Sequence, residues 1–170
     1  MNRKPLAVIA LAIGLVPLAQ AQSDLIPTNL NVRLGFVYPT ERATRNYTGQ
    51  MGGIGVDFNT TISLWKGAQG FFSIDFMTGA VSGDKGYFLP IMYNARIMLG
   101  QTPTGTSTYF FVGAGAVNMD VGVSKTVFGA RGGIGANLSE TTFLEATYMW
   151  SDDNGYVRAS NLGIYYGFRF

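Results

Sequence analysis

The sequence predicts an all-β protein, an eight-stranded antiparallel up-and-down transmembrane β-barrel. Eight segments alternate large apolar residues with small or polar ones, and this period of two is typical of strands. The composition is 47% hydrophobic and only 13% charged, which is apolar for a soluble protein. Beyond the N-terminal segment no apolar run is long enough for a membrane helix. A membrane span would therefore require a closed barrel, the other structure that satisfies every backbone polar group in lipid.

The first segment, 1–21, has the three parts of a secretory signal peptide. Basic residues precede an apolar run at 6–18, and the small residues Ala19 and Ala21 mark a cleavage site. We therefore expect a signal peptide at 1–21 and a barrel domain at 22–170. The barrel domain has equal numbers of basic and acidic residues, and this balance does not favour nucleic-acid binding.

Eight segments are expected to form strands, separated by connections rich in turn-forming residues. The expected strands are 29–38, 51–64, 70–78, 87–99, 106–119, 126–138, 142–150 and 157–170. One boundary stays open, because Asn59, Thr60 and Thr61 could themselves form the turn between the second and third strands.

The two faces of the strands differ in a way that assigns them to lipid and lumen. One face is bulky, apolar and continuous, and the other combines glycine with single charges in mid-strand. A soluble barrel places apolar residues inside, whereas a membrane barrel places them outside. Lys66, Lys85 and Lys125 fall in predicted connections, although lysine would be expected on the exposed face of a soluble sheet. We therefore expect glycine and a few long polar residues in the lumen, which eight strands leave only just wide enough for side chains.

Aromatic residues gather near the predicted strand ends, as in the girdles that flank the apolar band of membrane barrels. One predicted girdle contains Trp65, Phe71, Phe72, Tyr109, Phe110, Phe143 and Phe168. The other contains Tyr38, Tyr87, Tyr148, Trp150 and Tyr156.

The charges in mid-strand form the candidate site. They are Arg33, Asp57, Asp75, Arg96, Arg131, Glu145 and Arg169. Isolated charges in a narrow lumen are costly, so we expect these side chains to pair or to bind water. The planar guanidinium fork suits bidentate contact with carboxylates. This pattern favours a salt-bridged plug, with a gate, an ion-selective constriction or a ligand site as alternatives.

The sequence resembles the small eight-stranded outer-membrane barrels of the OmpA transmembrane-domain, OmpX, opacity-protein and OmpW type. The resemblance rests on the signal-peptide pattern, the eight alternating segments and the aromatic segment 165–170. It implies a location in the cell outer membrane, contact with outer-membrane lipids and lipopolysaccharide, and recognition by the barrel assembly machinery. The assembly signal that it implies consists of Ile164, Tyr166, Phe168 and Phe170.

We expect a monomeric structural protein with a largely closed lumen. A small pore or a conduit for hydrophobic molecules is the first alternative, and a soluble periplasmic binding barrel is the second. The chain has no Cys and no His, which excludes a cysteine nucleophile, a Ser-His-Asp triad and thiolate or imidazole metal ligands. We therefore expect no enzyme activity, no cofactor and no metal.

The connections offer weaker signals. Arg42 and Arg45 could meet lipopolysaccharide phosphates. Asp152, Asp153 and Asn154 offer oxygen ligands for a divalent cation, but a turn closed by Asp or Asn side chains is favoured.

Overall fold

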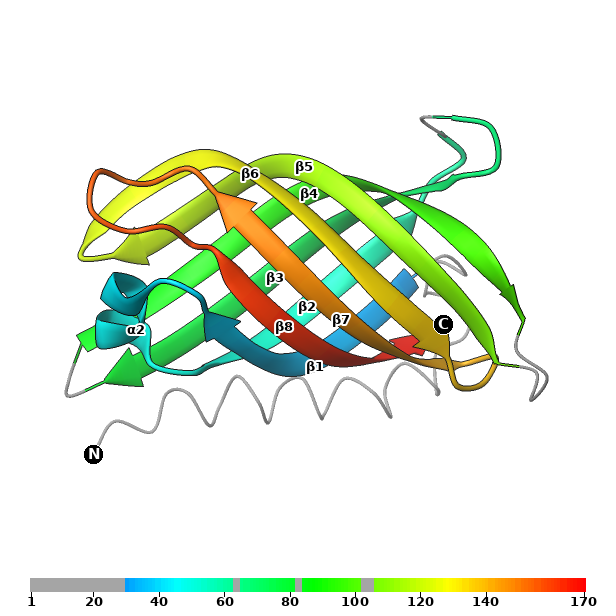
Figure 1. Cartoon of the computed structure of the whole chain (residues 1–170), viewed down its shortest axis with the longest axis horizontal. Coiled ribbons are helices and arrows are strands. Elements are labelled where there is room, and N and C mark those ends of the chain that lie inside the picture. The colour runs from blue at the N-terminus through cyan, green and yellow to red at the C-terminus, as the bar shows by residue number, and fades with distance from the viewer. Residues whose placement is uncertain (1–29, 63–64, 82–83, 102–105) are drawn as a thin grey trace.

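The computed structural model describes residues 30–62, 65–81, 84–101 and 106–170, and the predicted signal peptide lies outside them. The elements in chain order are β1 (Leu30–Pro39), α2 (Arg42–Thr48), β2 (Met51–Asn59), β3 (Gln69–Val81), β4 (Asp84–Gln101), β5 (Ser107–Val121), β6 (Val123–Asn137), β7 (Thr142–Ser151) and β8 (Asn161–Arg169). Each strand pairs antiparallel with the next, and β8 pairs with β1 to close the barrel (Figure 1). The fold class predicted from the alternation is confirmed.

Some strand ends differ from the prediction. β4 and β6 begin earlier than expected, so Lys85 and Lys125 lie in strands rather than in connections. β2 ends at Asn59 and the connection begins at Thr60, which was the alternative left open. β8 begins only at Asn161. Strand pairing continues past the turn-forming residues wherever the backbone hydrogen bonds of a hairpin can still be made.

The connection after β1 was expected to be a loop and instead contains the short helix α2. Gly49 ends the helix with a φ of 60°, and its N–H donates to the Arg45 carbonyl at 2.9 Å. The helix and the β7–β8 connection lie at the same end of the barrel (Figure 1). The Thr44 hydroxyl donates to the Arg158 carbonyl at 2.8 Å, and the Arg158 N–H donates to Glu41 Oε2 at 3.0 Å. These bonds tie the helix to that connection. Among the described residues, no helix is long and apolar enough to span a membrane.

Side chains alternate between exposed outward positions and buried inward positions. In β8, the outward residues Leu162 and Ile164 are 53% and 62% exposed, whereas the next residue, Tyr165, points inward and is buried. Within the described strands, Lys85 and Asp120 are the charged residues at outward positions, and both lie near hairpin tips at the α2 end. The outward face is therefore apolar over most of its length.

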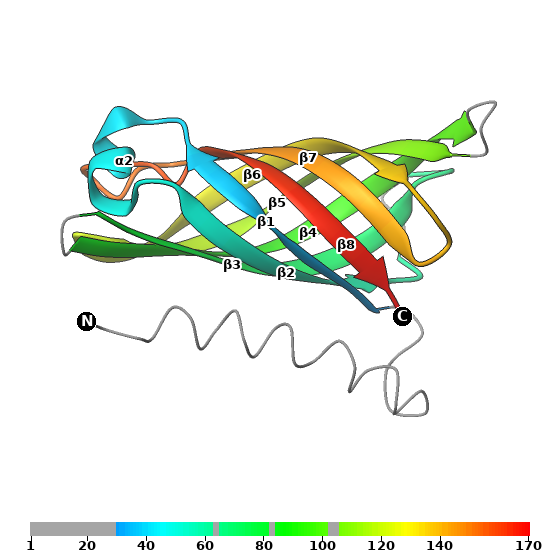
Figure 2. The same cartoon turned by 90° about the horizontal axis from the view of Figure 1, so that it is seen from below.

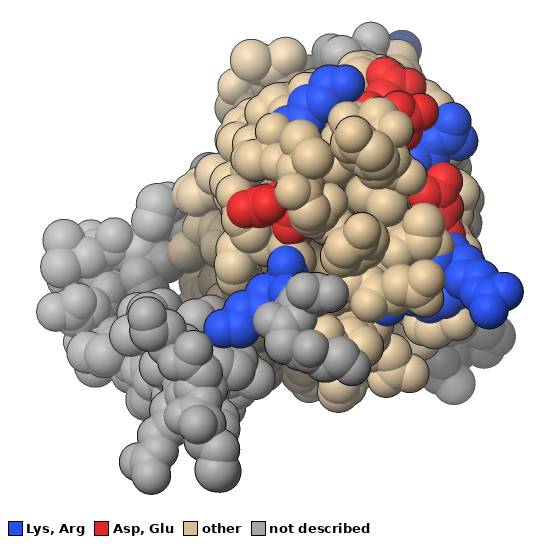
Figure 3. All heavy atoms as spheres, turned by 90° about the vertical axis from the view of Figure 1, so that its left-hand side faces the viewer, with Lys and Arg blue, Asp and Glu red and all other residues tan. Residues whose placement is uncertain are grey.

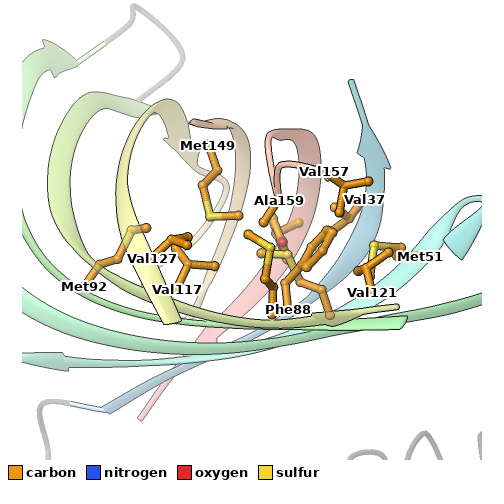
Figure 4. Packing of buried hydrophobic residues seen from close by; sticks show 13 residues of the cluster. Val37, Met51, Phe88, Met92, Val117, Val121, Val127, Met149, Val157 and Ala159 are labelled. Atoms are coloured by element: carbon orange, nitrogen blue, oxygen red, sulfur yellow. The ribbon is translucent and has the colours of Figure 1, made fainter. Parts of the chain in front are cut away.

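The barrel interior is filled by two apolar clusters on either side of the charged residues. The methionine cluster lies at the α2 end and consists of Val37, Met51, Met77, Phe88, Met92, Val117, Met119, Val121, Val127, Met149, Val157, Ala159 and Tyr165 (Figure 4). The aromatic cluster lies toward the end that holds the C-terminus (Figure 2) and consists of Phe71, Tyr109, Phe111 and Phe143. We expected glycine and a few polar residues here, but five of the seven methionines point inward. Flexible thioether side chains fill the gaps that glycine leaves.

Three residues of the predicted girdles are placed elsewhere. Phe71, Tyr109 and Phe143 are completely buried in the aromatic cluster, so the girdle prediction is wrong for them. Residues an even number of positions apart on a strand point to the same face, which is here called their strand parity. Phe71 lies four residues before Asp75 on β3, and Phe143 lies two residues before Glu145 on β7, so both rings face inward with these carboxylates. The exposed members of the predicted girdles are Trp65, Tyr38, Tyr148, Trp150 and Tyr156.

Candidate functional site in the barrel lumen

Three consecutive strands bring the first ion pair together. Arg33 on β1 lies opposite Gly55 on β2, and Gly55 lies opposite Asp75 on β3. A Cβ atom at Gly55 would be 2.0 Å from Asp75 Oδ1 and 2.7 Å from Arg33 Nε. Gly55 therefore leaves the space in which Arg33 and Asp75 meet across the intervening strand.

Arg33 is the centre of the network and contacts all three lumen carboxylates. Its Nη2 donates to both oxygens of Asp75, at 2.8 and 3.0 Å, and its Nε adds a bond of 3.1 Å to Asp75 Oδ1. Its Nη1 donates to Asp57 Oδ2 at 3.2 Å and to Glu145 Oε1 at 2.9 Å. Arg33 and the three carboxylates are each exposed by 1% or less, so one guanidinium binds carboxylates from three other strands in a buried interior.

Arg131 is the second cation of the network. Its Nη1 donates to Asp75 Oδ2 at 2.7 Å, and its Nε donates to Asn94 Oδ1 at 2.7 Å. Asn94 in turn donates to Ser73 Oγ at 3.0 Å. The alternation places Asn94 on the inward face, but only the structure shows that it orients Arg131. A Cβ on its cross-strand neighbour Gly113 would be 2.1 Å from Asn94 Oδ1.

Arg96 is bound mainly by aromatic rings. Its Nη2 lies 4.0 Å from Asp57 Oδ2, at the limit of an ion pair. Its guanidinium carbon lies 4.5 Å from the ring centroid of Phe71 and 4.7 Å from that of Tyr109. Arg96 is 4% exposed, so these cation–π contacts act without competition from bulk water.

Arg169 lies apart from the carboxylates. Among the described residues none lies within 4.0 Å of its guanidinium. Its Nη2 donates to Asn137 Oδ1, and its guanidinium carbon lies 5.1 Å from the ring centroid of Phe143. Arg169 thus differs from the expected ion pairing, because an amide and a ring take the place of a carboxylate.

Bulky inward rings lie over glycines of the neighbouring strand. Phe143 pairs with Gly167, and a Cβ there would be 2.1 Å from the ring. Tyr109 pairs with Gly135, where the corresponding distance is 2.2 Å, and the Tyr109 hydroxyl donates to Glu145 Oε2 at 3.1 Å. Neither ring is among the predicted lumen residues, although the inward position of each ring and the glycine opposite it are the signals that identify them.

The six most deeply buried charges balance each other. The three positive charges of Arg33, Arg96 and Arg131 equal the three negative charges of Asp57, Asp75 and Glu145. Arg169 is an additional cation outside this balance. A buried network of this kind holds several strands in register, and removing one partner leaves an uncompensated charge. Among the described residues there is no group of three or more His, Cys, Asp or Glu suited to a metal ion.

The β7–β8 connection contains the predicted turn. Asp153 Oδ1 accepts from the Gly155 N–H at 2.9 Å, and Asn154 Oδ1 accepts from the N–H groups of Tyr156 and Val157, each at 3.0 Å. These side-chain oxygens are thus bound by the backbone, which confirms the turn.

Comparisons with known proteins support the architecture. No protein-family model and no curated protein sequence matches the chain. Solved structures with the same fold include the outer-membrane protein Ail of Yersinia pestis in a phospholipid nanodisc, at 12% identity and a TM-score of 0.51, covering 83% of this chain and 98% of Ail. A de novo designed transmembrane β-barrel is similar at 14% identity and a TM-score of 0.53, covering 85% of this chain and 98% of the design.

The N-terminal β-barrel domain of Pseudomonas aeruginosa OprF is also similar, at 13% identity and a TM-score of 0.50, covering 84% of this chain and 98% of that domain. At these identities the likeness shows the fold alone. The chain thus has the fold of small eight-stranded outer-membrane barrels, and membership of a particular family stays a prediction.

Proposed function

We propose that this protein is a monomeric, non-enzymatic, structural barrel of the outer membrane, with a lumen that does not conduct. The observation that carries the proposal is the filled interior. Arg33, Asp75 and Arg131 connect β1, β3 and β6 across the lumen, and the methionine cluster fills the space between them and α2. An ion crossing the barrel would have to break buried ion pairs and then enter an apolar layer, and both steps are costly.

The outward face supports membrane insertion. Phe36, Ile134 and Ile164 are 82%, 64% and 62% exposed, and each would gain about 1.5–3 kcal/mol on burial in an apolar phase. A charge at the bilayer midplane would cost about 2–4 kcal/mol, and the outward charges of the described strands are confined to the α2 end. Figure 3 shows Lys, Arg, Asp and Glu side chains on that end of the molecule. This distribution opposes the soluble periplasmic barrel.

The two ends of the barrel suit the two sides of the membrane. By the resemblance stated above, the end that holds the C-terminus faces the periplasm, and the α2 end faces outward. There Arg42 is exposed and suits lipopolysaccharide phosphates. Arg45 is less available, because its Nη1 donates to the carbonyls of Pro39 and Thr40 at 2.8 and 2.7 Å. The closed barrel has no free strand edge for a second copy, which supports a monomer.

Recording in planar lipid bilayers tests the closed lumen. We expect no steady conductance steps from protein that shows the heat-modifiable gel shift of a folded barrel. Steady steps that grow on Arg96→Ala or Arg131→Ala would contradict the proposal and favour a pore. Membrane fractionation tests the location, because mature protein that stays soluble without detergent would contradict insertion.

A further inference from the structure

Buried polar atoms without a hydrogen-bond partner gather on the side of the ion network that faces the C-terminal end of the barrel, which is the periplasmic end in the proposed orientation. Six of the eight such atoms belong to this region of the described lumen. They are Asn31 Nδ2, Asp57 Oδ1, Asn59 Oδ1, Arg96 Nε, Arg96 Nη2 and Arg131 Nη2. Buried polar groups in a folded protein normally have partners, so a cluster of unpartnered ones indicates an occupant.

The unpartnered donors outnumber the unpartnered acceptors. Asn31 lies directly opposite Asp57 in the β1–β2 register, so one water between them would satisfy both the amide and the carboxylate. Three guanidinium nitrogens of Arg96 and Arg131 then have no acceptor. These nitrogens belong to two guanidinium groups, each with one positive charge, and a charged donor without an acceptor in a buried site is especially costly. Asn59 Oδ1 is the one remaining acceptor, so the group that meets these donors must accept more hydrogen bonds than it donates.

The charges around these donors also indicate that the bound group is an anion. Arg96 has one carboxylate at 4.0 Å, and Arg169 has none within that distance among the described residues. Arg169 lies within electrostatic range of Arg96, Tyr109 and Glu145. Arg96 and Arg169 are therefore two like charges beside the Tyr109 ring, and Glu145 is the nearest counter-charge, at more than 4.0 Å from Arg169. Arg33, Arg96 and Arg131 balance Asp57, Asp75 and Glu145, so Arg169 leaves the described side chains of the lumen with one excess positive charge. Two like charges, one of which, Arg96, has unpartnered donors, are stabilised by an anion between them.

We propose that Arg96, Arg131 and Arg169 form a binding site for a small inorganic anion, such as chloride or phosphate, at the periplasmic end of the lumen. The ring centroids of Phe71 and Tyr109 lie 4.5 and 4.7 Å from the Arg96 guanidinium carbon, so the two rings flank the site. Arg96 contributes Nε and Nη2, and Arg131 contributes Nη2. Arg169 is only partly buried and provides the entrance. A dissolved anion and the phosphate of a lipid headgroup offer the same chemistry to these donors.

The test uses the full protein in a maltoside detergent, which contains no phosphate. Nuclear magnetic resonance follows the Nε–Hε signals of the arginines while chloride or phosphate replaces gluconate. We expect saturable shifts of the Arg96 and Arg131 signals. Phosphatidylglycerol added to the same micelles provides the second arm, and a response to this lipid alone would assign the site to a headgroup phosphate.

Variants of the arginines that bind the anion, and of one distant arginine as a control, complete the test. Arg169→Gln should weaken the apparent affinity at least tenfold, and Arg96→Lys, which keeps the charge but removes the fork, should do the same. Arg158→Gln, at the opposite end of the barrel, should leave the affinity unchanged. Absence of a saturable response to both anions and lipid would show that the site holds water only and would overturn the proposal. An unchanged affinity in Arg169→Gln would overturn its entrance role.

Discussion

Arg131 of β6 donates to Asp75 of β3 at 2.7 Å, although three strand-to-strand steps separate the two residues around the barrel wall. Asp75 also accepts three bonds from Arg33 of β1. One carboxylate therefore joins three separate parts of the wall. This arrangement fixes the relative positions of strands that share no backbone hydrogen bonds.

Asp75→Asn should destabilise the protein by about 3–5 kcal/mol, because it leaves Arg33 and Arg131 in a dry interior with one carboxylate fewer. Urea unfolding in lipid vesicles, followed by the fluorescence of Trp65 and Trp150, measures the change. Asp152→Asn is the matched control, since Asp152 is exposed. A loss no larger than that of the control would show that the network contributes little to stability.

Strand parity predicted much of the site. Once the apolar face is assigned outward, Arg33, Asp75 and Glu145 must point inward, and the structure brings these three together. Parity determines whether a residue faces the lumen or the lipid. It determines neither the position of the residue along the barrel axis nor the residue with which it interacts. Arg169 shares the inward face, yet its position near the chain end keeps it away from the carboxylates. Register and strand tilt decide this, and neither is encoded in the alternation of one strand.

Gly167→Ala should destabilise the barrel by about 1–3 kcal/mol, because the new methyl group overlaps the Phe143 ring that packs on this glycine. Gly52→Ala is the control and should change stability by less than about 0.5 kcal/mol, since nothing lies within 4 Å of its added Cβ. The same urea titration measures both. Combining Gly167→Ala with Phe143→Leu should recover part of the loss, and the absence of recovery would argue against ring packing as the cause.

The apolar filling of the lumen does not follow from the alternation of the strands. The positions of Phe71 and Phe143 near strand ends predict a girdle, but both residues alternate in step with the inward residues Asp75 and Glu145 and therefore face the lumen. The inward methionines cannot be recognised from the alternation, because apolar residues on the inward face resemble those on the outward face. A narrow barrel must fill its interior, so it carries apolar side chains on both faces.

Removing the row formed by Met77, Phe88 and Met119 should open the lumen to ions. These residues pair in sequence across β3, β4 and β5 within the methionine cluster. Replacing all three by glycine removes part of the apolar barrier, and we expect conductance steps in planar bilayers where the unmodified protein gives none. Phe76→Gly combined with Leu89→Gly, at outward positions, is the control and should stay silent. A silent triple variant that still folds would place the barrier in the ion network instead.

Glu41→Ala should loosen the cover of the α2 end. Glu41 accepts from the backbone N–H of Arg158, and loss of this bond removes one of the links between α2 and the β7–β8 connection. Amide exchange of Thr44 and Arg158 should become about tenfold faster, as expected for one charge-assisted hydrogen bond. Arg42→Ala, on the same helix but exposed, should leave exchange unchanged. Equal rates in both variants would show that packing rather than Glu41 holds the helix.

Deletion of Phe170 should separate assembly in cells from folding in vitro. Phe170 donates its N–H to the Leu30 carbonyl at 3.0 Å, beyond the last residue of β8, so its loss removes little of the barrel itself. We therefore expect the purified variant to refold into vesicles with the unmodified yield, while the amount in the outer membrane falls several-fold. Phe170→Tyr keeps a terminal aromatic ring and should restore the amount. If the deletion lowers refolding and cellular amounts equally, Phe170 stabilises the barrel and is not an assembly signal.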